Sequence, residues 1–163
     1  MPVETVDRAR LELDAESERV RREIDALFEK LLVSRNDGRD MLFAAMRHAA
    51  IGGGKRLRPL LTVASARLFG ISWERALRVG AAIEAIHVYS LIHDDLPCMD
   101  NDDLRRGKPT VHKAFGEAEA VLAGDSLHAL AFEILAHPAT HEDPWVRSDL
   151  VLELAVPLPA SSP

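Results

Sequence analysis

The sequence predicts an all-α protein in which long helices pack on one another. Apolar residues recur at roughly helical spacing over several long stretches, with charged residues between them. Alternation with a period of two residues is nowhere sustained, and the aromatic content of 5% is low for a β protein. We therefore expect a helical architecture, and the evidence for strands is thin.

The first two predicted helices cover residues 3–33 and 41–51. Residues 3–33 contain no glycine, and their apolar positions recur at helical spacing from Leu11 onward. The turn-forming sequence Asn36-Asp37-Gly38 ends the first helix. Three consecutive glycines, residues 52–54, follow the second helix and separate it from the next.

The remaining predicted helices cover residues 58–69, 73–93, 117–136 and 146–154. Pro59 falls in the first turn of its helix, where the missing N–H costs nothing, and Gly70 follows as a C-cap. Pro97 lies just beyond the next helix and prevents it from continuing. Residues 97–110 have the composition of a loop.

Composition favours a soluble, single-domain, cytoplasmic protein. The chain has 163 residues, of which 47% are hydrophobic and 28% charged, which fits a globular domain with a sizeable core. Its formal net charge of −6 argues against binding nucleic acid or an anionic membrane, since both require a basic face. A lone cysteine, Cys98, excludes an internal disulfide. The N-terminus lacks the apolar stretch of a signal peptide, and we predict no transmembrane segment because Glu84 and His87 interrupt the most apolar stretch.

The C-terminal residues differ from the rest of the chain. Residues 155–163, AVPLPASSP, contain three prolines, which a core helix cannot carry. We therefore expect a single domain over residues 1–154 and an irregular proline-rich tail over 155–163. The tail is either a natural disordered end or the sign of a chain that has been cut short.

The segment with the strongest chemical signal is HDDLPCMDNDDLRRGKPT, residues 93–110. It places five aspartates within ten residues and then three cations. Asp94 and Asp95 fall at a predicted helix C-terminus, where the helix dipole disfavours carboxylates, so the cluster repels itself unless cations bind. Carboxylate oxygens suit Mg²⁺ shared with substrate phosphates, and Arg105 and Arg106 supply donors for phosphate oxygens. The segment therefore indicates a diphosphate site, although a solvated loop of self-paired charges remains an alternative.

The second signal is the glycine loop GGGKRLRP, residues 52–59. Glycines allow close approach of the backbone to a ligand, and a helix N-terminus follows, which favours anions. Lys55, Arg56 and Arg58 supply three cations, but the sequence is not a Walker A loop because Arg56 stands where Ser or Thr is required. The alternative is an ordinary glycine-rich turn with surface cations.

Residues on the helix before the aspartates complete the candidate site. His87 lies seven residues before Asp94 and therefore shares its helix face. Tyr89 and Ser90 project from the same helix about 6–7.5 Å below Asp94, where an aromatic side chain could limit ligand length or simply pack in the core. The pair His93-Asp94 also keeps a metal phosphohydrolase open as an alternative, which leaves the glycine loop and the paired arginines unexplained.

Together these motifs resemble a known family. The sequences GGGKRLRPLL and EAIHVYSLIHDDLPCMDNDDLRRGKPTVHKAFGEAEAVLAGDSLHALAFEIL are similar to the N-terminal half of short-chain polyprenyl diphosphate synthases, above all bacterial farnesyl and plant-type geranylgeranyl diphosphate synthases. The resemblance extends from about Met41 to Leu135. It implies an all-α isoprenoid-synthase bundle, apparently truncated, that joins isopentenyl diphosphate to an allylic diphosphate such as dimethylallyl or geranyl diphosphate.

The resemblance also implies a role for each motif residue. Asp94 and Asp100, with Asp95 assisting, would hold Mg²⁺ on the allylic diphosphate, and Arg105 would contact the same group. The diphosphate of isopentenyl diphosphate would bind four residues: Lys55, Arg58, His87 and Arg106. Asp94, Asp100 and Arg105 would act in catalysis. Tyr89 and Ser90 would form the floor of the pocket, which limits the length of the prenyl chain.

Two departures from the family pattern limit what the resemblance implies. Family members are nearly twice as long and carry a second aspartate-rich motif, which this chain lacks. We hypothesise a truncated or frameshifted gene product, since Ala-Val-Pro-Leu at Ala155–Leu158 follows from codons for Ala-Arg-Ala-Ser when one nucleotide is lost.

The expected product of the reaction is farnesyl diphosphate, and we expect this fragment to be inactive by itself. The alternatives are a geranylgeranyl diphosphate synthase and a non-catalytic diphosphate-binding homologue, and the full-length family is typically homodimeric.

Overall fold

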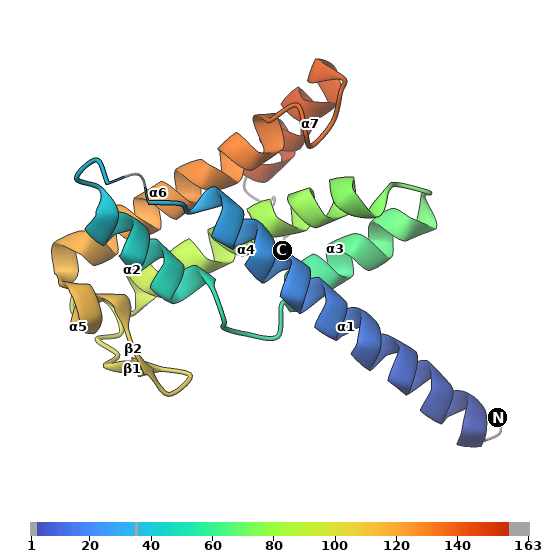
Figure 1. Cartoon of the computed structure of the whole chain (residues 1–163), viewed down its shortest axis with the longest axis horizontal. Helices are drawn as coiled ribbons and strands as arrows, with labels where there is room; N and C mark the ends of the chain where they lie inside the picture. Colours follow the sequence, from blue (N-terminus) through green and yellow to red (C-terminus); the bar gives the residue numbers. More distant parts are fainter. Residues whose placement is uncertain (1–2, 35, 157–163) are drawn as a thin grey trace, which may run out of the picture.

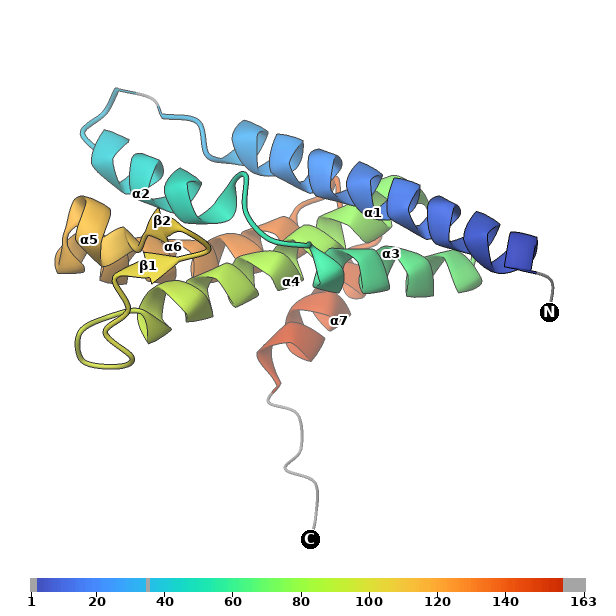
Figure 2. The same cartoon turned by 90° about the horizontal axis from the view of Figure 1, so that it is seen from below.

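A long central helix, α4 (Trp73–Asp94), runs through the middle of the molecule and contacts α1, α2, α3 and α6 (Figures 1 and 2). The structure is a computed structural model that describes residues 3–34 and 36–156. The other helices are α1 (Val3–Leu31), α2 (Asp40–Ala50), α3 (Leu57–Leu68), α5 (Val111–Phe115), α6 (Glu117–Ala136) and α7 (Pro144–Ala155). The prediction of an all-α architecture is confirmed.

Small residues allow the helices to approach α4 closely. Its buried positions include Ala81, Ala82 and Ala85, all fully enclosed by the neighbouring helices. At Gly80 a Cβ atom would lie 3.0 Å from the Cα of Pro59, so glycine at this position permits α3 to pack directly against α4. The first turn of α3 is thereby fixed relative to α4, and this contact positions the glycine loop that precedes it.

Helix α1 covers the core with only part of its length. Val20, Ile24 and Phe28 are completely buried and follow the i, i+4 spacing expected of a helix face. The N-terminal part of α1 extends beyond the other helices (Figure 1), and Leu11 there is exposed. The predicted amphipathic pattern thus describes a helix whose second half packs in the bundle.

The ends of the elements differ from prediction by a few residues. Helix α1 ends at Leu31 rather than at residue 33, and α7 begins at Pro144 because the side chain of Asp143 caps it by accepting from the Trp145 N–H at 2.8 Å. The expectation of a simple loop over 97–110 is wrong in one respect. A two-stranded hairpin forms from β1 (Leu104–Arg105) and β2 (Lys108–Pro109), and the short helix α5 follows it.

No helix within residues 3–34 and 36–156 is sufficiently long and apolar to cross a bilayer. Of the proline-rich tail predicted over 155–163, Ala155 is the last residue of α7 and Val156 caps it. The rest of that predicted tail lies outside the described residues.

Candidate functional site

The β1–β2 hairpin folds the arginine pair back onto the end of α4. Leu104 pairs with Pro109 and Arg105 with Lys108, and the turn residues Arg106 and Gly107 have φ angles of 54° and 78°. Two consecutive positive φ angles are typical of the tight turn that matches the twist of antiparallel strands. The turn therefore brings cations that follow the aspartates in sequence into contact with the helix that precedes them.

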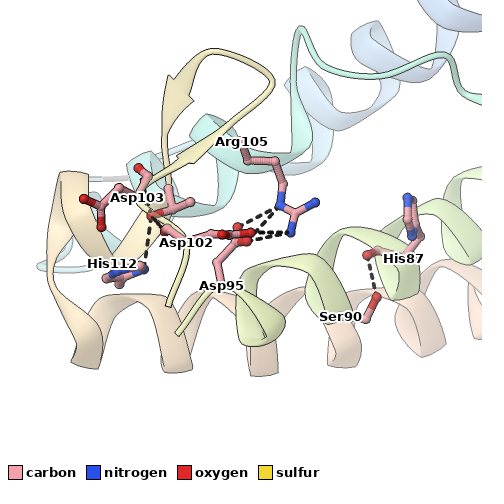
Figure 3. Close-up of polar contacts among 8 residues, drawn as sticks. His87, Ser90, Asp95, Asp102, Asp103, Arg105 and His112 are labelled. Carbon is pink, nitrogen blue, oxygen red and sulfur yellow. Dashed lines mark hydrogen bonds and ion pairs between the residues drawn. The ribbon is translucent and has the colours of Figure 1, made fainter. Parts of the chain in front are cut away.

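Arg105 and Asp95 form a close ion pair (Figure 3). Arg105 Nε lies 2.9 Å from both carboxylate oxygens of Asp95, and Nη2 lies 2.6 Å from Oδ1. Asp95 is only 4% exposed, and its hydrogen bonds raise the pKa of Arg105 above the ordinary value. In this structure the carboxylate of Asp95 is the counter-ion of Arg105, and its assisting role at a metal, which the family resemblance implied, stays a prediction.

Asp94 and Asp100 are held together through their backbones. The Asp100 N–H donates to the Asp94 carbonyl oxygen at 2.9 Å, and within the described ranges neither carboxylate makes a hydrogen bond or salt bridge. Over the same ranges no group of three or more His, Cys, Asp or Glu side chains is arranged to hold a metal. Two carboxylates fit Mg²⁺ that takes its remaining ligands from phosphate and water, so the donor set suits a metal shared with substrate.

The hairpin also contacts the glycine loop between α2 and α3. A Cβ atom at Gly54 would lie 2.2 Å from Nη1 of Arg106, and one at Gly52 would lie 3.8 Å from Nζ of Lys108. Gly54 has a φ of +80°, so both the backbone conformation and the guanidinium above it require glycine. Arg106 therefore lies directly over the loop. Sequence reasoning did not place Lys108 in the site, and only the hairpin's fold brings it there.

Four residues from separate segments line one cavity of about 370 Å³. They are Lys55 from the glycine loop, Arg58 from α3, His87 from α4 and Arg106 from the hairpin turn. The structure thus brings together the residues that the resemblance assigned to the diphosphate of isopentenyl diphosphate. Lys55, Arg58 and Arg106 are exposed, so their cationic groups remain accessible to an anion.

An adjoining cavity of about 160 Å³ has a different character. It shares His87, Arg106 and the glycine loop with the first cavity, and Asp95 and Arg105 also line it. Helix α4 contributes Val88, Leu91 and Ile92 to its apolar wall. Charged groups and an apolar wall therefore meet beside His87, an arrangement suited to a ligand that combines a phosphate group with a hydrocarbon.

His87 responds to the charges gathered around it. Burial is the largest cause that lowers its pKa, and Arg58, Arg106 and Arg105 lower it further, while Glu84 acts in the opposite direction. Because its pKa is lowered, the His87 imidazole is neutral at neutral pH. An anion among these arginines would offset their charge and favour the imidazolium form.

The structure gives Arg56 a role that differs from that of its sequence neighbours. Its side chain is 1% exposed and turns inward to salt bridges with Asp25 and Glu84, at 2.6 and 2.9 Å. The sequence does not distinguish Arg56 from the neighbouring cations Lys55 and Arg58. Its salt-bridge partners lie 31 and 28 residues away, and no local pattern indicates them.

Tyr89 and Ser90 lie outside both cavities described above. The Tyr89 ring packs edge-on against His93 in its own helix and against His128 of α6, with centroid distances of 5.3 and 5.0 Å. The Ser90 hydroxyl donates to the His87 carbonyl oxygen at 2.9 Å (Figure 3). Tyr89 thus faces the α4–α6 contact, and the chain-length role of both residues stays a prediction.

Comparison with known proteins identifies the family. Residues 39–153 match the family described as Polyprenyl synthetase, and the chain belongs to that family. It is 53% identical over 115 residues to the chloroplastic geranylgeranyl pyrophosphate synthase of Capsicum annuum, covering 71% of this chain and 31% of the relative. It is 54% identical over 103 residues to the farnesyl diphosphate synthase of Bacillus subtilis, covering 63% of this chain and 35% of the relative.

Solved structures show the same fold. The apo structure of an FPP/GFPP synthase from Zymomonas mobilis superposes with a TM-score of 0.87 at 63% identity, over 89% of this chain and 52% of that one. A geranyltransferase from Legionella pneumophila gives a TM-score of 0.69 at 42% identity, over 80% and 45% of the two chains. The predicted isoprenoid-synthase bundle is confirmed. This chain spans about a third of the two curated relatives above and about half of these solved chains.

Proposed function

We propose that this chain carries the substrate-binding half of a polyprenyl diphosphate synthase, which joins isopentenyl diphosphate to an allylic diphosphate. The observation that supports this most is the convergence of Lys55, Arg58, His87 and Arg106 on one cavity, next to a second cavity that Asp95 and Arg105 line. Four potential donors from separate segments match the several oxygens of a diphosphate. Family membership makes prenyl transfer the reaction in which such a site is used.

The chain's own residues bind and orient the two diphosphates. Isopentenyl diphosphate binds with its double bond toward the allylic carbon, and its diphosphate is held by Lys55, Arg58, His87 and Arg106. Arg105 leaves Asp95 to contact the allylic diphosphate. Asp94 and Asp100, with Asp95 assisting, would hold Mg²⁺, which would supply electrostatic stabilisation of negative charge on the allylic diphosphate.

The reaction balances without any further reactant. The allylic C–O bond breaks and its electron pair leaves with the diphosphate, whose developing charge the arginine donors stabilise. The isopentenyl double bond then supplies the electrons of the new C–C bond, and a proton is lost to a diphosphate oxygen. Apolar residues around the hydrocarbon exclude water, which would otherwise capture the cation.

Farnesyl diphosphate is the product we propose, because Tyr89 places an aromatic ring one turn before the aspartates. A geranylgeranyl product is the second candidate, since the similar curated proteins include synthases named for each product. The cytoplasmic location expected from the sequence stays a prediction, because several similar proteins are named as chloroplastic.

The test is incorporation of labelled isopentenyl diphosphate by a complete synthase that contains this sequence, with dimethylallyl or geranyl diphosphate and Mg²⁺, because we expect the chain by itself to be inactive. Arg58→Met should abolish incorporation, whereas Arg67→Met, which alters an exposed arginine in the last turn of the same helix, should not. The length of the product distinguishes farnesyl from geranylgeranyl. Binding without turnover would instead support the non-catalytic alternative, and release of inorganic phosphate would indicate a hydrolase.

A further inference from the structure

A buried ion network joins the glycine loop to two helices. Arg56 is the N-cap residue of α3 and has a left-handed backbone with a φ of 50°. Its Nη2 lies 2.6 Å from Asp25 of α1 and also donates to the carbonyl oxygen of Ala50 at the end of α2, while Nη1 lies 2.9 Å from Glu84 of α4. A single side chain therefore contacts the helices on three sides of the loop.

Asp25 connects the same network to the loop backbone. One carboxylate oxygen, Oδ1, accepts from Arg56, and the other, Oδ2, accepts from the Gly52 N–H at 3.2 Å. Gly52 and Arg56 therefore both donate hydrogen bonds to Asp25 of α1. Gly53, Gly54 and Lys55 lie between these two attachments, so the conformation of the whole loop depends on them.

Stability alone does not explain this buried ion network. Buried ion pairs contribute little net stability because desolvation opposes their attraction. The Nε of Arg56 is also buried without a hydrogen-bond partner among the described residues, which is unfavourable. A function in the site would explain why this costly arrangement stands next to the cavity that Arg56 and Glu84 both line.

We propose that Arg56 is a positioning residue, which with Asp25 and Glu84 fixes the glycine loop so that Lys55 and Arg58 converge with His87 and Arg106 on a diphosphate. Glu84 is one helical turn before His87, so Arg56 aligns the loop with that part of α4. The inference rests on the proposed function and extends it. It makes α1, which contributes no residue to the cavity, part of the support of the binding site.

The test variant is Arg56→Met together with Glu84→Met. Replacing Arg56 alone would leave the carboxylates of Asp25 and Glu84 without their partner and could prevent folding. The double variant removes the fully buried pair, leaves Asp25 bonded to the Gly52 N–H, and does not change the net charge near the cavity. A loss of affinity then reports the position of the loop and not its charge. Arg67→Met is the control, since it removes an exposed salt bridge between α3 and Glu16 of α1.

Two measurements on the full chain decide the matter. Calorimetry without Mg²⁺ measures the affinity for inorganic pyrophosphate, and amide hydrogen exchange measures the protection of residues 52–55. We expect the double variant to keep its helical circular dichroism, to bind pyrophosphate about ten-fold more weakly, the equivalent of one charge-assisted hydrogen bond, and to exchange faster in the loop alone.

Each outcome has a separate meaning. Unchanged affinity and loop protection in the double variant, with pyrophosphate binding intact in the parent chain, would overturn the positioning role and leave the proposed function standing. Weakened binding in Arg67→Met as well would also overturn it, because any lost contact to α1 would then suffice. A parent chain that fails to bind pyrophosphate would overturn the proposed function itself, and the inference with it.

Discussion

Replacing Gly54 by alanine should separate the two reasons why glycine is required at this position, which are the nearby guanidinium of Arg106 and the positive φ angle. A Cβ atom at position 54 would lie 2.2 Å from Nη1 of Arg106 and 3.0 Å from its Cζ, so the guanidinium must move away. The φ of +80° adds backbone strain. Gly70 has a similar φ of +70° with no atom within 4 Å, and Gly70→Ala is therefore a matched control.

The magnitudes follow from these contacts. A left-handed backbone costs a non-glycine residue about 1–2 kcal/mol, which should lower the melting temperature of either variant by about 2–8 °C. The collision adds little to this, because the end of the flexible Arg106 side chain can swing aside. Displacement of that guanidinium should, however, weaken pyrophosphate binding about ten-fold or more in Gly54→Ala alone, as expected for the loss of a charge-assisted hydrogen bond.

Thermal denaturation followed by circular dichroism and pyrophosphate titration by calorimetry measure the two effects on the same samples. Wild-type affinity in Gly54→Ala would refute the reasoning, because Arg106 could then leave its place over the loop without consequence. An equal loss of affinity in Gly70→Ala would refute it as well, since destabilisation alone would account for the result.

Three further predictions address other parts of the site. Because the pKa of His87 is lowered below its ordinary value of 6.5, its contribution to stability is present above that pH and is lost as the pH falls through the lowered pKa. A bound anion favours the protonated form, so the pyrophosphate affinity of the parent chain relative to His87→Gln should increase as the pH falls from 8 to 6. A constant ratio of the two affinities would contradict the assignment. Gly124→Ala should lower the free energy of unfolding by about 1–3 kcal/mol, measured by urea denaturation, because its Cβ would lie 2.1 Å from His93 Nε2 in the α4–α6 contact. Tyr89→Ala in a complete synthase should lengthen the prenyl product seen by chromatography, and an unchanged product distribution would exclude the floor role.

Much of the fold was predictable because its determinants are local in sequence. Helical periodicity defines each helix of ten or more residues to within a few residues, since burial of one helix face requires apolar residues every three to four positions. The aspartate cluster and the glycine loop are also contiguous segments, so their chemistry can be recognised from the order of residues alone. The short hairpin was missed because two-residue strands leave no periodic pattern.

By itself, the sequence determined the helical architecture, the family and the residue types available for binding a diphosphate. Only the tertiary structure decided which of those charges face a ligand and which neutralise one another. Arg56 and Arg58 are two residues apart and both line the cavity, yet Arg56 is buried in salt bridges with Asp25 and Glu84 whereas Arg58 is exposed. Likewise Asp95 pairs with Arg105, whereas its neighbour Asp94 makes no salt bridge within the described residues. The physical reason is that an ion pair depends on distance in space, and partners from distant segments meet only when the helices pack.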